Sequence, residues 1–124
     1  MTSTNKKKLD RIFSKYIRKR DTKKGYGKCV TCRVIKPYED LDCGHYISRQ
    51  HLATRWDEYN CAIQCRKCNR FMGGEQDEFA VYLMDKYGKD IIHELNKSKW
   101  TPIKLDDLWA MGQIQYFKDK IEDL

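Results

Sequence analysis

Two Cys-x-x-Cys pairs are the residues of this sequence whose spacing points most directly to chemistry. Cys29 and Cys32 form the first pair, and Cys65 and Cys68 form the second. Each pair places two thiolates within reach of one ion, so the four together make a complete tetrahedral set for zinc. A redox dithiol is the alternative, but it does not account for two pairs, and no βαβ pattern surrounds them. We therefore predict a structural Zn²⁺ bound by four cysteines, with no position left for water.

Three polar side chains lie between and beside the cysteine pairs, in an order that indicates hydrolysis of a phosphodiester. A histidine that is neutral near pH 7, such as His45, can take a proton from an attacking water. The amide oxygen of Asn69 is a hard ligand suited to Mg²⁺ or Mn²⁺, and the amide of Asn60 could tie the intervening loop and fix His45. Taken singly, each has an ordinary structural interpretation, as a histidine of the fold or an asparagine in a cap or turn. Their joint order favours a catalytic site.

The strands and helices that must position these residues can be predicted from the pattern of apolar residues and from the glycine and proline residues that end them. The 32 residues between Cys32 and Cys65 exceed the gap of a simple zinc ribbon, so they must form a structured insertion. Gly73 and Gly74 end the last element. The pattern predicts, in chain order, a strand at 38–47 preceded by Pro37, a loop at 48–59, a short strand at 60–64 and a helix at 66–72.

Helices are expected on both sides of this core. Residues 1–8 are polar and expected to fray, and residues 21–27 are expected to form a loop. A helix is predicted between them from the spacing of Leu9, Ile12, Phe13, Tyr16 and Ile17. The C-terminal part is expected to be helical, with three apolar stripes: Phe79, Tyr82, Leu83 and Tyr87 before Gly88; Ile91, Ile92 and Leu95; and Leu108, Ile114, Phe117, Ile121 and Leu124.

The size and charge of the chain limit the function classes. A chain of 124 residues is expected to form one domain, comprising a basic helical arm (1–28), a zinc-bound core (29–72) and a helical C-terminal part (73–124). The net charges of 1–28, 29–71 and 72–124 are +9, +2 and −4. A basic first part favours binding to a polyanion such as DNA, with a solvated helix face as the alternative.

The composition also bears on the compartment. No apolar run is long enough to cross a bilayer, and the N-terminus is polar and basic without an apolar signal segment. We therefore expect a cytoplasmic protein with no membrane partner, in a reducing environment where clustered cysteines hold metal.

Motifs over residues 16 to 88 resemble a known group of enzymes. The resembling residues are Ile17-Arg18 with Arg20-Asp21, Cys29-Val30-Thr31-Cys32, Leu41-Asp42-Cys43-Gly44-His45-Tyr46, Arg55-Trp56-Asp57-Glu58, Asn60, and Gln64-Cys65 with Cys68-Asn69. Together they resemble the HNH, or His-Me finger, nucleases, and more closely the phage NinG family, also called Rap, of recombination endonucleases. The resemblance implies an α+β fold: a zinc-stapled ββα-metal finger with flanking N- and C-terminal helices. It also implies a phage-encoded, structure-selective endonuclease that acts in the host cytoplasm on branched DNA such as Holliday, D-loop or Y junctions.

The resemblance assigns roles to individual residues. His45 takes the general-base position, Asn60 the central asparagine and Asn69 the final metal-ligand position. Most relatives carry an Asp or His ligand directly before the base, where this sequence has Gly44. Strand alternation places Asp42 on the same face as Gly44, so we predict Asp42 as the second ligand of a catalytic Mg²⁺ or Mn²⁺. An exposed carboxylate without that role is the alternative, and the rival ligands are Glu75, Asp77 and His51.

The remaining candidates are less specific. Basic residues expected to hold DNA phosphates, with plain surface charges as the alternative, are Arg18, Arg49, Arg55, Lys67 and Arg70. Cys43 and Cys61 are expected to be small buried hydrophobes and His93 a structural residue. The competing functions are a zinc-containing DNA-binding adaptor without catalysis and an HNH nuclease that cuts ordinary duplex. Paired cuts at a four-way junction would call for a homodimer, for which the apolar C-terminal stripe offers a surface.

Overall fold

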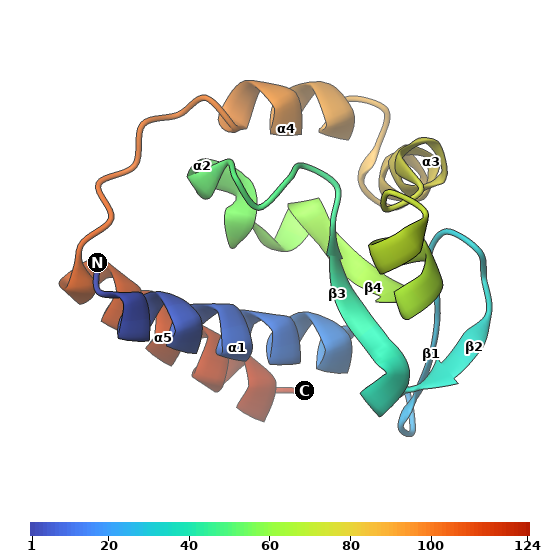
Figure 1. Ribbon diagram of the computed structural model, residues 1–124, viewed down its shortest axis with the longest axis horizontal. Coiled ribbons are helices and arrows are strands. Elements are labelled where there is room, and N and C mark those ends of the chain that lie inside the picture. Colours follow the sequence, from blue (N-terminus) through green and yellow to red (C-terminus); the bar gives the residue numbers. More distant parts are fainter.

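A short antiparallel hairpin lies at the centre of the computed structural model, which describes residues 1–124 (Figure 1). Strand β3 (Leu41–His45) pairs with β4 (Cys61–Cys65), and a smaller sheet pairs β1 (Tyr26–Lys28) with β2 (Ile35–Pro37). The helical elements are α1 (Ser3–Arg20), η1 (Tyr38–Asp40), α2 (Leu52–Arg55), η2 (Glu58–Asn60), the π-helical turn η3 (Lys67–Phe71), α3 (Gln76–Tyr87), α4 (Ile91–Ser98) and α5 (Asp107–Glu122). The predicted α+β class is confirmed.

Alternation along β3 and β4 gives the central hairpin two distinct faces. His45 lies opposite Cys61 and Gly44 lies opposite Ala62, and residues that are opposite in the register share a face. The face with His45, Cys43 and Cys61 packs toward α1, where Cys61 joins a buried cluster. The face with Gly44 and Ala62 packs toward α3. One hairpin therefore positions both His45 and, at its other end, Cys65.

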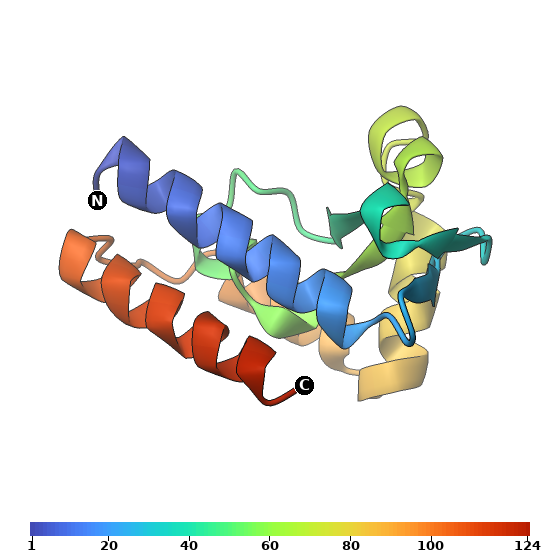
Figure 2. The same cartoon turned by 90° about the horizontal axis from the view of Figure 1, so that it is seen from below.

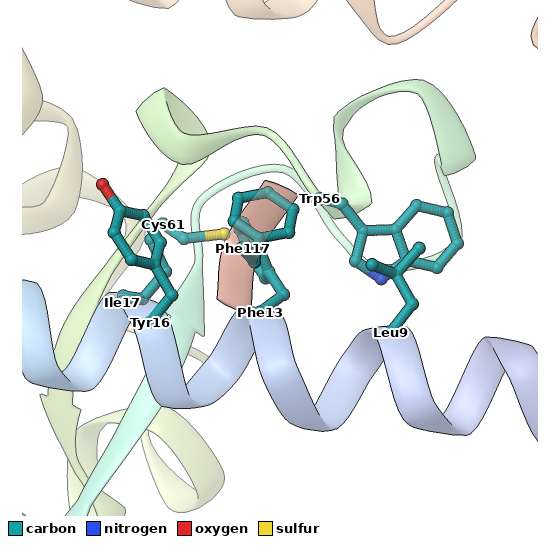
Figure 3. Packing of buried hydrophobic residues seen from close by; sticks show 7 residues of the cluster. All are labelled: Leu9, Phe13, Tyr16, Ile17, Trp56, Cys61 and Phe117. Carbon is teal, nitrogen blue, oxygen red and sulfur yellow. The ribbon is translucent and has the colours of Figure 1, made fainter. Parts of the chain in front are cut away.

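Helices α1 and α5 run side by side along the first face (Figure 2). The rings of Phe13 and Phe117 meet edge to face, with their centroids 5.0 Å apart. Burial of each such side chain contributes about 1.5–3 kcal/mol. The predicted apolar face of α1 is confirmed, and the cluster it forms is shown in Figure 3: Leu9, Phe13, Tyr16, Ile17, Trp56, Cys61 and Phe117.

The second core lies between the other face of the hairpin and the helices α3 and α4. It contains Ile47, Ala62, Phe79, Leu83, Ile91 and Leu95. Gly88 ends α3 in a backbone conformation with φ of 103°, which a residue with a side chain rarely adopts. The predicted helical stripes of residues 79–95 are thus confirmed.

The expectation that residues 1–8 fray is wrong. Helix α1 begins at Ser3, because the Thr2 side chain accepts a hydrogen bond from the Asn5 amide and caps its first turn. The start is also tied to the opposite end of the chain. The terminal ammonium of Met1 lies 2.9 Å from the carbonyl oxygen of Leu105, and the Thr2 amide donates to Asp107 at 2.7 Å.

Other boundaries also differ from the sequence-based expectation. The strand predicted from residue 38 begins at Leu41 after the η1 turn, and the predicted loop at 48–59 contains the short helix α2. The β1–β2 hairpin was not predicted, because three-residue strands are too short to show an alternation pattern. Leu108 and Leu124 are exposed, so the α5 face that packs on α1 is narrower than the predicted stripe. None of the helices is both long and apolar enough to cross a membrane.

Candidate functional site

The four cysteines of the two Cys-x-x-Cys pairs converge on one point. Their Sγ atoms all lie within 4.8 Å of one another, and those of Cys32 and Cys65 are 3.6 Å apart. A tetrahedral zinc with Zn–S of about 2.3 Å holds its sulfurs about 3.8 Å apart. Burial alone raises the pKa of the Cys29 thiol, but hydrogen bonds from the Cys32 backbone and Thr31 side chain lower it to about 6. The set fits a structural zinc ion.

A chain of buried polar groups connects the four cysteines to the central hairpin. The Thr31 hydroxyl lies 3.3 Å from the Cys29 sulfur and accepts a hydrogen bond from the Gln64 amide nitrogen at 3.2 Å. The same nitrogen donates to the Gly74 carbonyl at 2.8 Å. A Cβ at position 44 would lie 2.1 Å from the Gln64 amide oxygen. A residue with a side chain at position 44 would therefore force the buried Gln64 side chain to move.

His45 lies at the end of β3, with its ring held from one side. Its Nε2 lies 2.8 Å from the carbonyl oxygen of Arg55, and its ring centroid lies 6.2 Å from that of Phe13 on α1. Since a carbonyl oxygen accepts hydrogen bonds, Nε2 carries the hydrogen and Nδ1 keeps the lone pair of the neutral ring. The imidazole is thus oriented as a base through Nδ1.

The surroundings of His45 keep its ring neutral. Burial is the largest effect and lowers its pKa below the ordinary 6.5, and the positive charges of Arg49 and Arg55 lower it further. The hydrogen bond to the Arg55 carbonyl and the negative charge of Asp10 act in the opposite direction, but the net shift is downward. A neutral imidazole at pH 7 is the form that accepts a proton.

Asn60 joins the two ends of the loop between β3 and β4. Its amide oxygen accepts from the Ile47 backbone amide at 2.7 Å, and its amide nitrogen donates to the carbonyls of Ile47 and Thr54 at 3.1 and 3.0 Å. The side chain is fully buried. Asn60 therefore has no free atom for substrate and acts on the site by fixing the loop that supplies the Arg55 carbonyl.

Asp10 on α1 organises the same loop, and sequence reasoning missed it. One carboxylate oxygen accepts from the Trp56 indole at 2.9 Å, and the other accepts from the guanidinium groups of Arg55 at 2.7 Å and Arg49 at 3.0 Å. Burial alone raises the pKa of Asp10, but these donors outweigh it and lower the pKa. No sequence signal marked this lone acidic residue of a basic helix as a partner of residues 49–56.

The two predicted ligands of the catalytic ion lie side by side. The Asn69 amide nitrogen lies 3.1 Å from Oδ2 of Asp42, and the guanidinium of Arg70 donates to both carboxylate oxygens at 2.9 and 3.0 Å. A carboxylate and an amide oxygen are hard donors of the kind that Mg²⁺ prefers. The donor set fits such an ion, provided that Arg70 gives up its pairing with Asp42 and that the Asn69 amide turns its oxygen toward the carboxylate.

A cavity of about 500 Å³ brings the candidates together. It is lined by His45, Asn69 and Asp42 and by residues of α1, with basic side chains around it: Lys7, Arg11, Arg49 and Arg70. A second cavity of about 650 Å³ adjoins it and shares His45 and Asn69. The imidazole and the ligand pair therefore open onto one hollow with a basic rim.

Not every predicted residue lies at this hollow. Arg18 does not line it, and its guanidinium lies 4.6 Å from the ring centroid of Tyr38. Lys67 is exposed beside Cys32 and Cys65 at a different cavity. Arg55 points its guanidinium at Asp10 rather than outward. Among the sequence-predicted phosphate contacts, Arg49 and Arg70 are the two that line the site.

Of the three rival metal ligands, one lies at the site and two do not. His51 lines the larger cavity together with His45, and its ring packs edge to face on Trp100. Glu75 and Asp77 line neither cavity. Asp42 is the acidic residue that stands next to Asn69.

The Arg20-Asp21 dipeptide, one of the motifs of the resemblance, anchors α1 to β4. Arg20 donates to the backbone carbonyls of Glu58 and Cys61 at 2.9 Å each, and Asp21 accepts from the Ile63 amide at 3.2 Å. The pair is itself joined at 2.7 Å. This contact sets the position of α1 relative to the hairpin and hence to His45.

Comparison with known proteins gives matches over most of the chain. A family model described as "Bacteriophage Lambda NinG protein" matches residues 2–124. Two relatives, each named Protein ninG, come from Escherichia phage 933W and Enterobacteria phage VT2-Sa. Each is 27% identical over 100 residues, which cover 77% of this chain and 48% of the relative, so the chain spans about half of their length. No solved structure matches.

Proposed function

The chain belongs to the NinG family, and from this premise we propose that it is a metal-dependent DNA endonuclease of the HNH, or His-Me finger, type. One observation carries the proposal. A neutral histidine, oriented through Nε2 by a backbone carbonyl, opens onto the same basic-rimmed cavity as an amide and a carboxylate. Hydrolysis of a phosphodiester needs a base for the water and a cation beside the phosphate.

His45 acts as the base through Nδ1. Water attacks the scissile phosphorus as its proton passes to Nδ1, and the bond from phosphorus to the 3′ oxygen breaks. The leaving oxygen takes a proton, so the products are 5′-phosphate and 3′-hydroxyl ends. General-base assistance of this kind contributes about 10²–10⁴-fold to the rate.

Asn69 and Asp42 would hold Mg²⁺ or Mn²⁺, which supplies charge neutralisation at the phosphate when bound. Arg70 exchanges its contact with Asp42 for a DNA phosphate, since guanidinium groups pair with either anion. Arg49, Lys7 and Arg11 hold neighbouring phosphates around the cavity. Binding thus releases the carboxylate at the moment that the substrate arrives.

Zinc bound by the four cysteines has a structural role, because a full set of four sulfurs leaves no position for water. The hydrogen bonds of the Thr31 and Gln64 side chains connect Cys29 to the hairpin, so the zinc ion also helps to fix the hairpin. The β3, loop, β4 and η3 order supports the comparison with a ββα-metal finger.

The family resemblance extends the proposal to the substrate. Recombination endonucleases of this kind act on branched DNA, so we propose four-way and other branched junctions as the preferred substrates. The positive charge of α1, which borders the cavity through Lys7 and Arg11, provides the surface for a second duplex arm.

The test compares cleavage with binding. Purified protein is incubated with a four-way junction and with a linear duplex of the same sequence, with Mg²⁺ and then with EDTA. His45→Ala should lose cutting by about 10²–10⁴-fold while junction affinity is kept, and His93→Ala, which changes an exposed histidine of α4, should cut normally.

Three results would contradict the proposal. Wild-type protein that binds the junction without cutting it in Mg²⁺ or Mn²⁺ would indicate a DNA-binding adaptor. Equal cutting of the two substrates would refute the selectivity for branches. An equal loss of binding and cutting in His45→Ala would assign His45 to the fold.

A further inference from the structure

A second cluster of metal-ligating side chains lies on the α1 face of the hairpin, away from the four zinc-binding cysteines. It consists of Cys43, His45 and Cys61, whose ligand atoms all lie within 4.8 Å of one another. The register explains the cluster, because Cys61 lies directly opposite His45, and Cys43 is two residues before His45 on the same strand face. Two sulfurs and an imidazole form a soft donor set, unlike the oxygen pair of Asp42 and Asn69.

We propose that Cys43, Cys61 and His45 form a binding site for a second, regulatory Zn²⁺ that occupies the catalytic base and stops cleavage. Zinc bound to two sulfurs and one imidazole keeps its ligand atoms about 3.5–3.8 Å apart. The three side chains therefore need to approach one another by at most about an ångström. Three protein ligands leave the fourth position of the tetrahedron to water.

Two of the three side chains line the active-site cavity, so a zinc ion can reach them from that cavity. Cys43 and His45 are half-buried and line both cavities of the site. Cys61 is buried in the cluster against α1 (Figure 3). Burial, and next the neighbouring Cys43 thiol, raise the pKa of Cys61 well above its ordinary value. Because zinc binds the thiolate form, the Cys61 thiol gives up its proton to solvent as its Zn–S bond forms.

Occupation of this site is incompatible with general-base catalysis. A neutral imidazole has one nitrogen with a free lone pair, and a bound zinc takes it. If Nδ1 binds the zinc, its lone pair is used in that bond. If Nε2 binds the zinc, Nδ1 carries the hydrogen of the neutral ring. In both cases Nδ1 cannot accept a proton from water. The loss of cutting rests on the proposed nuclease activity, whereas the binding of a second zinc does not.

The first test counts zinc without measuring cleavage. Protein loaded with one zinc is titrated with ZnCl₂ against a chromogenic chelator, and the wild type should take up a second equivalent. Cys43→Ala and Cys61→Ala should lose that second equivalent and keep the first, which also shows that both variants are folded. A wild type that stops at one equivalent, or variants that still bind two, would overturn the site.

Cobalt gives an independent signature of the ligands. Co²⁺ added to the one-zinc protein should produce sulfur-to-cobalt charge-transfer absorption in the near ultraviolet, since the site supplies two thiolates. This absorption should disappear in Cys43→Ala. Its persistence would assign the bound cobalt to the other cysteines.

The second test adds zinc to a cleavage assay in excess Mg²⁺. Wild-type cutting should stop as the second zinc binds, and Cys43→Ala should keep cutting at the same zinc concentration. Equal inhibition of both proteins would place the inhibitory zinc at Asp42 and Asn69 and overturn the regulatory role. If the wild type takes up two zinc ions but never cuts DNA, the proposed nuclease fails while the metal site stands.

Discussion

Nε2 of His45 donates its hydrogen to the backbone carbonyl of Arg55, 2.8 Å away. The side chain of the same Arg55 reaches in the other direction and pairs with Asp10 on α1 at 2.7 Å. One residue therefore links the N-terminal helix to the orientation of the ring. The position of α1 influences the proposed base without any side chain of that helix taking its proton.

The pH dependence of cleavage should reflect this arrangement. Burial first, and then the charges of Arg49 and Arg55, lower the pKa of His45, so the midpoint of its titration lies below 6.5. The rate of cleavage should fall at low pH, where the ring takes up a proton, and rise to a plateau with a midpoint below 6.5. A pH profile of kcat/KM on the junction measures the midpoint, and a midpoint above 6.5 would contradict the assignment.

Asp10→Asn should move that midpoint further toward acid. The carboxylate of Asp10 raises the pKa of His45 and partly offsets burial, so its removal favours the neutral ring. Asp40→Asn is the matched control, because Asp40 is half-exposed and pairs with Arg66 away from the cavity. A general loss of rate without a shift of the midpoint would indicate that Asp10 serves the fold alone.

Asn60→Ala should destabilise the protein rather than remove a catalytic atom. The change removes three hydrogen bonds and leaves the buried amide and carbonyl of Ile47 without partners, whereas the Thr54 carbonyl keeps the hydrogen bond from the Asp57 amide. We expect the free energy of unfolding in urea to fall by about 3 kcal/mol. Asn69→Ala, at a half-buried position, should leave stability nearly unchanged and reduce cutting, and the reverse pattern would exchange the two roles.

Local patterns in the sequence were sufficient to predict the central hairpin and most of the helices. The two Cys-x-x-Cys pairs mark the two ends of the insertion. The two-residue period of a strand indicated which side chains around Asp42, Cys43 and Gly44 share a face. The order strand, loop, strand, helical turn follows from those local signals.

The contacts that sequence reasoning missed join residues far apart in the chain. Thr2 caps the first turn of α1 locally, but Met1 and Thr2 also bind Leu105 and Asp107, and no residue near the N-terminus indicates those distant partners. The role of Asp10 depends in the same way on a loop that follows β3. Gly44 was recognised as a departure from relatives, but its cause, the Gln64 amide packed against it, is a tertiary contact.

Arg70→Ala should change the Mg²⁺ requirement of cleavage. Arg70 is half-exposed and covers both oxygens of Asp42, so its removal leaves the carboxylate free to hold the ion. The Mg²⁺ concentration for half-maximal cutting should fall several-fold, while DNA affinity weakens because one phosphate contact is lost.

Arg66→Ala is the matched control for that change. Arg66 is also half-exposed and pairs with Asp40, but it lies outside the cavity that His45 lines. It should leave the Mg²⁺ requirement unchanged. An unchanged requirement in both variants would remove Asp42 from the set of metal ligands.

Removal of the structural zinc should unfold the hairpin and with it the site. Structural zinc contributes about 10–16 kcal/mol of binding free energy, as much as the whole stability of a typical domain, about 5–15 kcal/mol. The β1 and β2 strands are three residues each, and the Thr31–Gln64 link depends on the position of Cys29. Cys65→Ser should therefore lose its cooperative thermal transition in circular dichroism, whereas Cys43→Ser should keep it.

Chelation separates the two metals in the same protein. After EDTA treatment and removal of the chelator, Mg²⁺ alone should restore neither the thermal transition nor cutting, because the cysteines that hold the hairpin bind soft ions in preference to magnesium. One equivalent of Zn²⁺ should restore the transition, and Mg²⁺ added afterwards should restore cutting. Recovery of cutting with Mg²⁺ alone would mean that the hairpin keeps His45 in place without its zinc, and that the four cysteines are dispensable for catalysis.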